Sequence, residues 1–205
     1  MNWLHKPKNL IWAINEALTF TVIYDACVLY PAPLRDLLMH LALTGAYRAR
    51  WSEQIHDEWT RNVLRNRPDV SETQLYRTVG LMNRAIPDSL VNDYEPLVQG
   101  LDLPDEDDRH VLAAAIKCGA SVIVTYNLKD FPAEILKRFE IEALHPDVFL
   151  SDIWDLDQAA VLKAVQKQRA ALNNPVYSPR ELLDILLKQR LPETVKHLSN
   201  YELLI

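Results

Sequence analysis

The strongest constraint on the fold is a pair of short apolar runs rich in β-branched residues. Residues 20–24 read FTVIY and residues 121–126 read SVIVTY, and neither run alternates between apolar and polar side chains. Runs of this kind are typical of strands that are buried on both faces of a parallel sheet. Helical spacing of apolar residues between the two runs therefore predicts an α/β fold with a parallel sheet.

Several helices have recognisable ends. One helix is expected to start at Pro33 and to end before Gly45, and a second is expected between its cap at Ser52 and Pro68. The sequence SETQ at residues 71–74 is a capping box, which predicts the start of a third helix.

The second apolar run is preceded by an alanine-rich helix over residues 108–118. Asp105 or Asp107 is expected to cap this helix, and Gly119 is expected to end it. A short strand is expected at residues 141–144. These elements complete an alternation of strands and helices.

The chain divides into three regions by pattern. Residues 1–20 form an N-terminal extension, in which an amphipathic helix over 1–18 is expected to pack on its own domain or on a second copy in a homodimer. Residues 21–146 form the α/β domain. Residues 147–205 show only helical patterns and form a C-terminal helical appendage, with helices expected at 148–171, 179–190 and 192–203.

Composition and charge exclude several classes of function. The chain has 205 residues with 22 Lys+Arg and 28 Asp+Glu, a net charge of −6, which excludes a protein that grips nucleic acid over its whole surface but leaves room for a local basic groove. There is no glycine-rich phosphate loop, no apolar stretch of membrane-spanning length and no secretion signal. The lone cysteines, Cys27 and Cys118, fit a reducing cytoplasm.

Polar side chains follow both apolar runs. Asp25 ends the first, Asn127 and Asp130 follow the second, and the acidic run at 105–108 opens the helix that leads into the second. Ligands bind at the carboxyl ends of parallel strands, where these groups are expected to meet. Clustered carboxylates repel one another by about 1 kcal/mol per pair at 4 Å even in water, and a divalent cation removes this cost. Oxygen ligands favour Mg²⁺ or Mn²⁺ over zinc. Taken singly, each acid could equally be a helix cap or an ordinary loop residue.

Four segments together resemble a known family. The segments YDACVL at 24–29, IHDEW at 55–59, DEDDRHVLAAA at 105–115 and VTYNLKDFP at 124–132 resemble, in order and spacing, the conserved blocks of PIN domains. With the helical C-terminal region, they resemble VapC-type toxins of bacterial toxin–antitoxin pairs. The resemblance implies a parallel sheet flanked by helices and a metal-dependent endoribonuclease.

The resemblance also implies the site residues. The catalytic acids would be Asp25, Glu58, Asp108 and Asp130, and the ligands of Mg²⁺ or Mn²⁺ would be Asp25, Asp108, Asn127 and Asp130. Metal of this kind positions a phosphodiester and activates a water molecule for attack.

Two positions depart from the family pattern, and three arginines are candidates for substrate binding. Cys27 stands where many PIN domains have Ser or Asn, and Asn127 stands where Asp is common. Arg35, Arg61 and Arg65 are the candidates for contacts with RNA phosphates, although solvated helix charges would explain each of them singly.

The partners that the resemblance implies are an RNA substrate and a cognate antitoxin protein, in the cytoplasm. Three alternatives remain at this point: a DNA-directed nuclease, a receiver-like phosphoacceptor, and a PIN fold that binds RNA without cutting it. The phosphoacceptor lacks support, because paired acids at the first strand end and a separate mid-domain Asp are not evident.

Overall fold

The structure, a computed structural model, describes residues 20–173 and 175–205. Its centre is a four-stranded parallel sheet with the strand order β2–β1–β3–β4. The strands are β1 (Thr21–Tyr24), β2 (Arg48–Arg50), β3 (Val122–Val124) and β4 (Glu142–Leu144). The parallel α/β fold is thus confirmed, with the two predicted apolar strands as neighbours. The helix expected over residues 1–18 lies outside the described residues.

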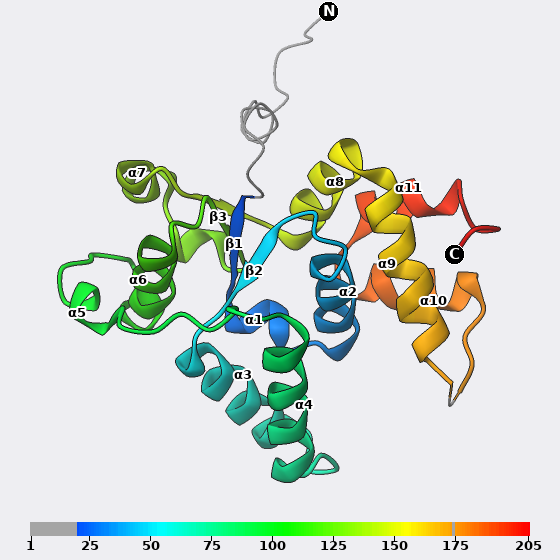
Figure 1. Ribbon diagram of the computed structural model, residues 1–205, viewed down its shortest axis with the longest axis horizontal. Coiled ribbons are helices and arrows are strands. Elements are labelled where there is room, and N and C mark those ends of the chain that lie inside the picture. The colour runs from blue at the N-terminus through cyan, green and yellow to red at the C-terminus, as the bar shows by residue number, and fades with distance from the viewer. Residues whose placement is uncertain (1–19, 174) are drawn as a thin grey trace, which may run out of the picture.

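Helices cover both faces of this sheet (Figure 1). The α-helices are α1 (Ala26–Leu29), α2 (Ala32–Ala42), α3 (Glu53–Asn66), α4 (Glu72–Ala85), α5 (Glu95–Val98), α6 (Arg109–Cys118), α7 (Ala133–Leu136), α8 (Pro146–Leu156), α9 (Gln158–Ala171), α10 (Pro179–Lys188) and α11 (Pro192–Ser199). Short 3-10 helices are η2 (Glu106–Asp108), η3 (Leu128–Asp130) and η4 (Lys137–Phe139). None of the helices in the described ranges combines the length and apolarity that a membrane span requires.

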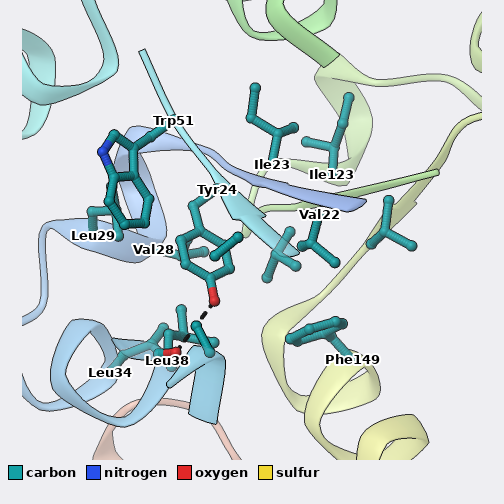
Figure 2. Packing of buried hydrophobic residues seen from close by; sticks show 14 of the residues in the cluster. Val22, Ile23, Tyr24, Val28, Leu29, Leu34, Leu38, Trp51, Ile123 and Phe149 are labelled. Carbon is teal, nitrogen blue, oxygen red and sulfur yellow. Dashed lines mark hydrogen bonds between the residues drawn. The ribbon is translucent and has the colours of Figure 1, made fainter. Parts of the chain in front are cut away.

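Successive side chains of β1 point to opposite faces of the sheet (Figure 2). Val22 and Tyr24 face α2 and α8, where Leu38 and Phe149 meet them, whereas Ile23 points to the other face. All five side chains are fully buried. The Tyr24 hydroxyl is satisfied inside the core by the Tyr47 hydroxyl, 2.6 Å away. Burial on both faces explains why this strand has no alternating pattern.

The predicted helix ends are largely confirmed. The Ser52 hydroxyl accepts a hydrogen bond from the Ile55 amide at 3.2 Å, and Ser71 and Gln74 form the capping box of α4. Gly119 ends α6 with a φ of 63°, in the left-handed region that glycine adopts without strain. These ends depend on contacts within a few residues, which is why the sequence shows them.

Two predictions about elements were wrong or incomplete. Strand β2 was not predicted, because its sequence Arg48-Ala49-Arg50 has one apolar residue and the strand lies at the sheet edge, where charged residues are common. The single helix expected over 148–171 is two helices. Asp157 separates α8 from α9, and its carboxylate caps α9 by accepting from the Ala160 amide at 2.9 Å.

The C-terminal helices are attached to the α/β domain by specific polar contacts as well as by apolar packing. Gln168 of α9 donates to the Pro33 carbonyl at 2.7 Å. The buried Asp147 carboxylate accepts from the amides of Glu193 and Thr194 at the start of α11, at 3.0 and 2.9 Å. Leu182, Leu183 and Leu186 of α10 are buried, whereas Leu187 is exposed. The appendage therefore has a fixed position on the sheet.

A buried polar network fixes α3 against α4. The Asn83 side-chain oxygen accepts from Trp51 Nε1 at 2.8 Å and from His56 Nε2 at 3.0 Å, while Trp59 Nε1 donates to His56 Nδ1 at 3.0 Å. The Trp59 bond requires an unprotonated Nδ1, so the imidazole is neutral with its hydrogen on Nε2. Burial lowers the pKa of His56, which favours the same neutral form.

We expect Asn83→Ala to destabilise the protein by about 2 kcal/mol, because two buried donors lose their acceptor. Urea unfolding followed by tryptophan fluorescence measures this change. Asn92→Ala, in an exposed loop, is the matched control and should change the free energy of unfolding by about 0.5 kcal/mol or less. Equal stability of the two variants would show that the network does not hold α3.

Candidate metal centre

Asp25 lies directly after β1, at the carboxyl edge of the sheet. Its amide donates to the Val124 carbonyl of β3 at 3.1 Å, which continues the strand pairing by one residue. Asp25 is the N-cap residue of α1, but its side chain makes no capping bond. One carboxylate oxygen, Oδ2, instead accepts from the Thr125 hydroxyl at 2.6 Å and from the Cys27 thiol at 2.9 Å. These two donors fix the orientation of a carboxylate that is only 2% exposed.

Cys27 acts as a hydrogen-bond donor beside Asp25. Its sulfur also accepts from the Tyr126 amide at 3.2 Å, so the thiol joins the loops after β1 and β3. Burial, together with the negative charge of Asp25, raises the pKa of the Cys27 thiol and keeps it protonated. Although Cys27 departs from the family pattern, a neutral thiol supplies the donor that a serine hydroxyl would supply.

Three more carboxylates meet beside this strand end. One oxygen from each of Asp105, Asp108 and Asp130 lies within 4.8 Å of the others. Asp108 stands at the junction of η2 and α6, and Asp130 ends η3, in the loop that follows β3. We call Asp25, Glu58, Asp105, Asp108 and Asp130 the acidic cluster.

The electrostatics of Asp108 connect the whole acidic cluster. Burial and, in the same direction, the negative charges of Asp25, Asp105, Asp130 and Glu58 together raise the pKa of Asp108 to about 7. Burial also raises the pKa of Asp25, against the hydrogen bonds from Cys27 and Thr125. Negative charge is therefore concentrated here at a cost in free energy, and this is the environment that a divalent cation stabilises.

Glu58 reaches the cluster from α3. Its Oε2 lies 3.3 Å from Nε2 of His110, a buried residue of α6 whose Nδ1 has no hydrogen-bond partner within the described residues. This contact joins the two helices that carry Glu58 and Asp108. His110 was not singled out from the sequence, although its position two residues after Asp108 was a usable signal.

Asp105 or Asp107 was expected to cap the helix that became α6, and this was wrong, because the N-cap residue of α6 is Asp108. Asp105 caps η2 instead, since its Oδ1 accepts from the Asp107 amide at 3.0 Å. Its carboxylate also belongs to the acidic cluster. A single sequence cannot separate these roles, because an aspartate at a helix start serves either one.

Asn127 lies at the same edge of the sheet with an exposed side chain. Its backbone amide donates to the Thr125 hydroxyl at 2.9 Å, and that hydroxyl in turn donates to Asp25. Asn127 thus supports the Asp25 carboxylate through its backbone, whichever role its carboxamide has. Its assignment as a metal ligand stays a prediction.

The three predicted substrate arginines have different surroundings. Arg35 donates to the Leu29 carbonyl at 2.5 Å and lies 4.5 Å from the Trp59 ring centroid, and burial lowers its pKa to about 10. The Arg35 guanidinium is therefore engaged in contacts within the protein. Arg61 and Arg65 are exposed on α3, the helix that carries Glu58, and are free to meet a ligand.

A separate groove of about 520 Å³ lies between α2, α4, α9 and α10. Its lining is mostly apolar and includes Arg35, but no member of the acidic cluster contributes to it. The groove is therefore distinct from the candidate centre.

The fold and the acidic cluster agree with the family comparisons. Residues 21–129 match the PIN domain family, and the chain belongs to that family. Residues 146–200 match the VapC50 C-terminal domain. The family resemblance and the flanked parallel sheet expected from the sequence are thereby confirmed.

A particular relative gives a narrower comparison. The protein described as "Putative ribonuclease VapC50" from Mycobacterium tuberculosis (strain H37Rv) is 49% identical to this chain over 82 residues. The alignment covers 40% of the chain and 48% of the relative, so it spans about half the length of the curated relative. No solved structure shows significant similarity to the chain.

We expect metal binding to depend on pH through Asp108. A carboxyl whose folded pKa is raised binds more protons when folded than when unfolded, so the metal-free protein loses stability as the pH rises from the unfolded value of 3.8 through about 7. A bound metal ion would offset the repulsion between the ionised Asp108 and the neighbouring carboxylates. The increase in melting temperature on adding Mn²⁺ should therefore be larger at about pH 8 than at about pH 6.

Differential scanning fluorimetry at both pH values measures this effect. Asp108→Asn, which carries no titrating carboxyl, should remove most of the difference between the two pH values. A Mn²⁺ shift that is the same at both pH values in the unmodified protein would contradict the role given to Asp108.

Proposed function

We propose that the protein is a metal-dependent endoribonuclease that hydrolyses RNA phosphodiester bonds at the acidic cluster. The observation that carries the proposal is the convergence of five carboxylates at the carboxyl edge of the sheet, where the charges of the other four raise the pKa of Asp108 in the same direction as its burial. Membership of the PIN domain family and the relative described as a ribonuclease support it.

The donor set fits Mg²⁺ or Mn²⁺. Asp25, Asp108 and Asp130 offer hard oxygen ligands, Asp105 adds a fourth carboxylate, and Asn127 would add a neutral oxygen. A bound cation would supply positive charge that stabilises the phosphodiester during attack and lowers the pKa of the attacking water.

The residues around the cluster have separate tasks. Thr125 and Cys27 hold the Asp25 carboxylate in one orientation through their bonds to its Oδ2. His110 lies 3.3 Å from Glu58 and would hold it, and Glu58 would accept a proton from the attacking water. Arg61 and Arg65 would bind RNA phosphates along α3, whereas Arg35 has its guanidinium engaged inside the fold.

We also propose that the three regions of the sequence have different functions. Residues 21–146 would hold the catalytic centre, residues 147–205 would extend the substrate surface, and residues 1–20 would form an extension. The family matches over 21–129 and 146–200 support this division.

We expect Asp25→Asn and Asp108→Asn each to reduce cleavage of a labelled single-stranded RNA by about 100-fold or more, because each removes a charged ligand. Asp105→Asn should also weaken cleavage while retaining the helix cap. The assay contains Mg²⁺ or Mn²⁺, and EDTA should abolish the reaction.

Asp184→Asn, an exposed carboxylate of α10, is the matched control and should cleave like the unmodified protein. Circular dichroism confirms that each variant is folded. Full activity of folded Asp25→Asn, or cleavage that is indifferent to EDTA, would falsify the mechanism. Cleavage of single-stranded DNA at an equal rate would instead indicate a DNA-directed nuclease.

We further propose that the protein is the toxin of a type II toxin–antitoxin pair that acts in the cytoplasm. The C-terminal match to the VapC50 domain and the relative of that name support this role. An antitoxin that inserts an Arg or Lys into the acidic cluster would neutralise the charge that otherwise attracts a metal ion.

We expect expression of the protein alone to stop bacterial growth and co-expression with the small neighbouring reading frame to restore it. A complex of the two proteins should purify together, and the partner should reduce the Mn²⁺-dependent increase in melting temperature. If no complex forms and growth is not restored, the toxin–antitoxin role is wrong, although the nuclease activity could still be present.

A further inference from the structure

The C-terminal helical region reaches the candidate centre through one tyrosine. The Tyr126 amide donates to Cys27 Sγ at 3.2 Å, and that thiol donates to Asp25 at 2.9 Å. The Tyr126 hydroxyl in turn donates to the Gln189 carbonyl at 2.7 Å, in the turn between α10 and α11. Tyr126 thus joins the surroundings of the Asp25 carboxylate, through its backbone amide, to a turn more than 60 residues later in the chain, through its hydroxyl.

The next residue of that turn is an arginine placed over the same ring. The Arg190 guanidinium lies 5.2 Å from the Tyr126 ring centroid, and the His145 ring meets Tyr126 edge-on with the centroids 5.1 Å apart. Tyr126 follows β3 and His145 follows β4, so both belong to the carboxyl edge of the sheet, where the acidic cluster lies. Arg190 is therefore a cation at the same edge of the sheet as the acidic cluster.

Arg190 is available for a ligand. It is exposed, and within the part of the chain that the structure describes no carboxylate pairs with it at 4.0 Å or less. A guanidinium stacked on an aromatic ring keeps its hydrogen-bond donors at the edge, where they can bind a phosphate in a bidentate manner.

The backbone holds Arg190 in place at some cost. Its φ of 61° is in the left-handed region, which favours glycine over arginine. The Arg190 amide donates to the Leu187 carbonyl at 3.0 Å, and the following Leu191 is fully buried. Asp147 anchors the start of α11 just beyond, as described above. Arg190 is the residue after the C-cap of α10, where a left-handed residue commonly ends a helix, and these contacts fix the position of its backbone.

We propose that Arg190 binds a phosphate of single-stranded RNA that flanks the scissile bond, so that the C-terminal region supplies part of the substrate site. This inference rests on the proposed ribonuclease function. The physical reason is electrostatic, because a cluster of carboxylates in a chain of net charge −6 repels an RNA backbone. A fixed cation beside the cluster offsets that repulsion where the strand enters or leaves.

The test compares Arg190→Gly with Arg190→Lys in the full-length protein. Glycine removes the guanidinium and suits the positive φ, so the fold should be retained or slightly stabilised. Lysine keeps a positive charge. The matched control is Arg138→Ala, since the Arg138 guanidinium also lies over an aromatic ring, 5.8 Å from the Phe139 centroid, but precedes β4 at the opposite edge of the sheet.

The measurement is cleavage of a labelled single-stranded RNA of mixed sequence with Mn²⁺, over a series of salt concentrations. For Arg190→Gly we expect KM to rise by about fivefold with kcat unchanged, because a contact to a non-reacting phosphate contributes equally to substrate and transition state. The slope of log KM against log salt should fall by about 0.7, the value for one phosphate contact to a single strand. Arg190→Lys should keep the salt slope, and Arg138→Ala should match the unmodified protein.

The outcomes separate this inference from the proposed function. If the unmodified protein cleaves RNA and Arg190→Gly has the same KM and salt slope, the inference is overturned and the ribonuclease function stands. A loss of kcat at unchanged KM, or a lysine variant as weak as the glycine variant with the same reduced slope, would also overturn it. If the unmodified protein cleaves no RNA with either metal, the proposed function fails, and this inference fails with it.

Discussion

The pairing of β1 with β3 is the constraint on which the rest of the site depends. Val22 pairs with Val122 and Tyr24 with Val124, so the two strands end side by side. The residues that follow, Asp25 and Thr125, are therefore brought within 2.6 Å although 100 positions separate them in the chain. Parallel pairing of buried apolar strands stabilises this edge, and the polar groups of the site occupy the positions just beyond the packed residues.

A site that concentrates negative charge needs support from neutral donors and from rigid helices. Thr125 and Cys27 donate to Asp25 and offset part of the cost of its burial. On the far side of the cluster, the Trp51–His56–Trp59–Asn83 network fixes α3, and with it Glu58, against α4. This buried network thus does more than stabilise the fold. By fixing α3, it also prevents Glu58 from moving away from the carboxylates that repel it.

The C-terminal region is part of the same structure as the sheet edge. Asp147, three residues after β4, caps the start of α11, and Tyr126, two residues after β3, bonds to the turn before it. Tyr126 lies in the loop after β3 and Asp147 in the first turn of α8, and both are at the carboxyl edge of the sheet. A family match over residues 146–200 that is distinct from the PIN domain match is consistent with a module whose position on that edge has been fixed. Through these contacts the C-terminal region can affect ligand binding at the carboxyl edge of the sheet.

The sequence alone determined the strands β1 and β3 and the capped ends of α3 and α4, because these signals depend on residues close together in the chain. The acids at 25, 58, 108 and 130 were predicted as site residues from a family pattern, and their roles stay predictions. The sequence did not predict β2, an edge strand whose two arginines hide the apolar pattern of a strand. It also did not predict that Asp157 separates α8 from α9. Only the tertiary structure decided that Asp105 joins the cluster, that Cys27 is a donor to Asp25, that His110 holds Glu58 and that Arg190 lies over Tyr126. The physical reason is that local patterns fix hydrogen bonds within a few residues, whereas distances between remote side chains depend on how the helices pack around the sheet.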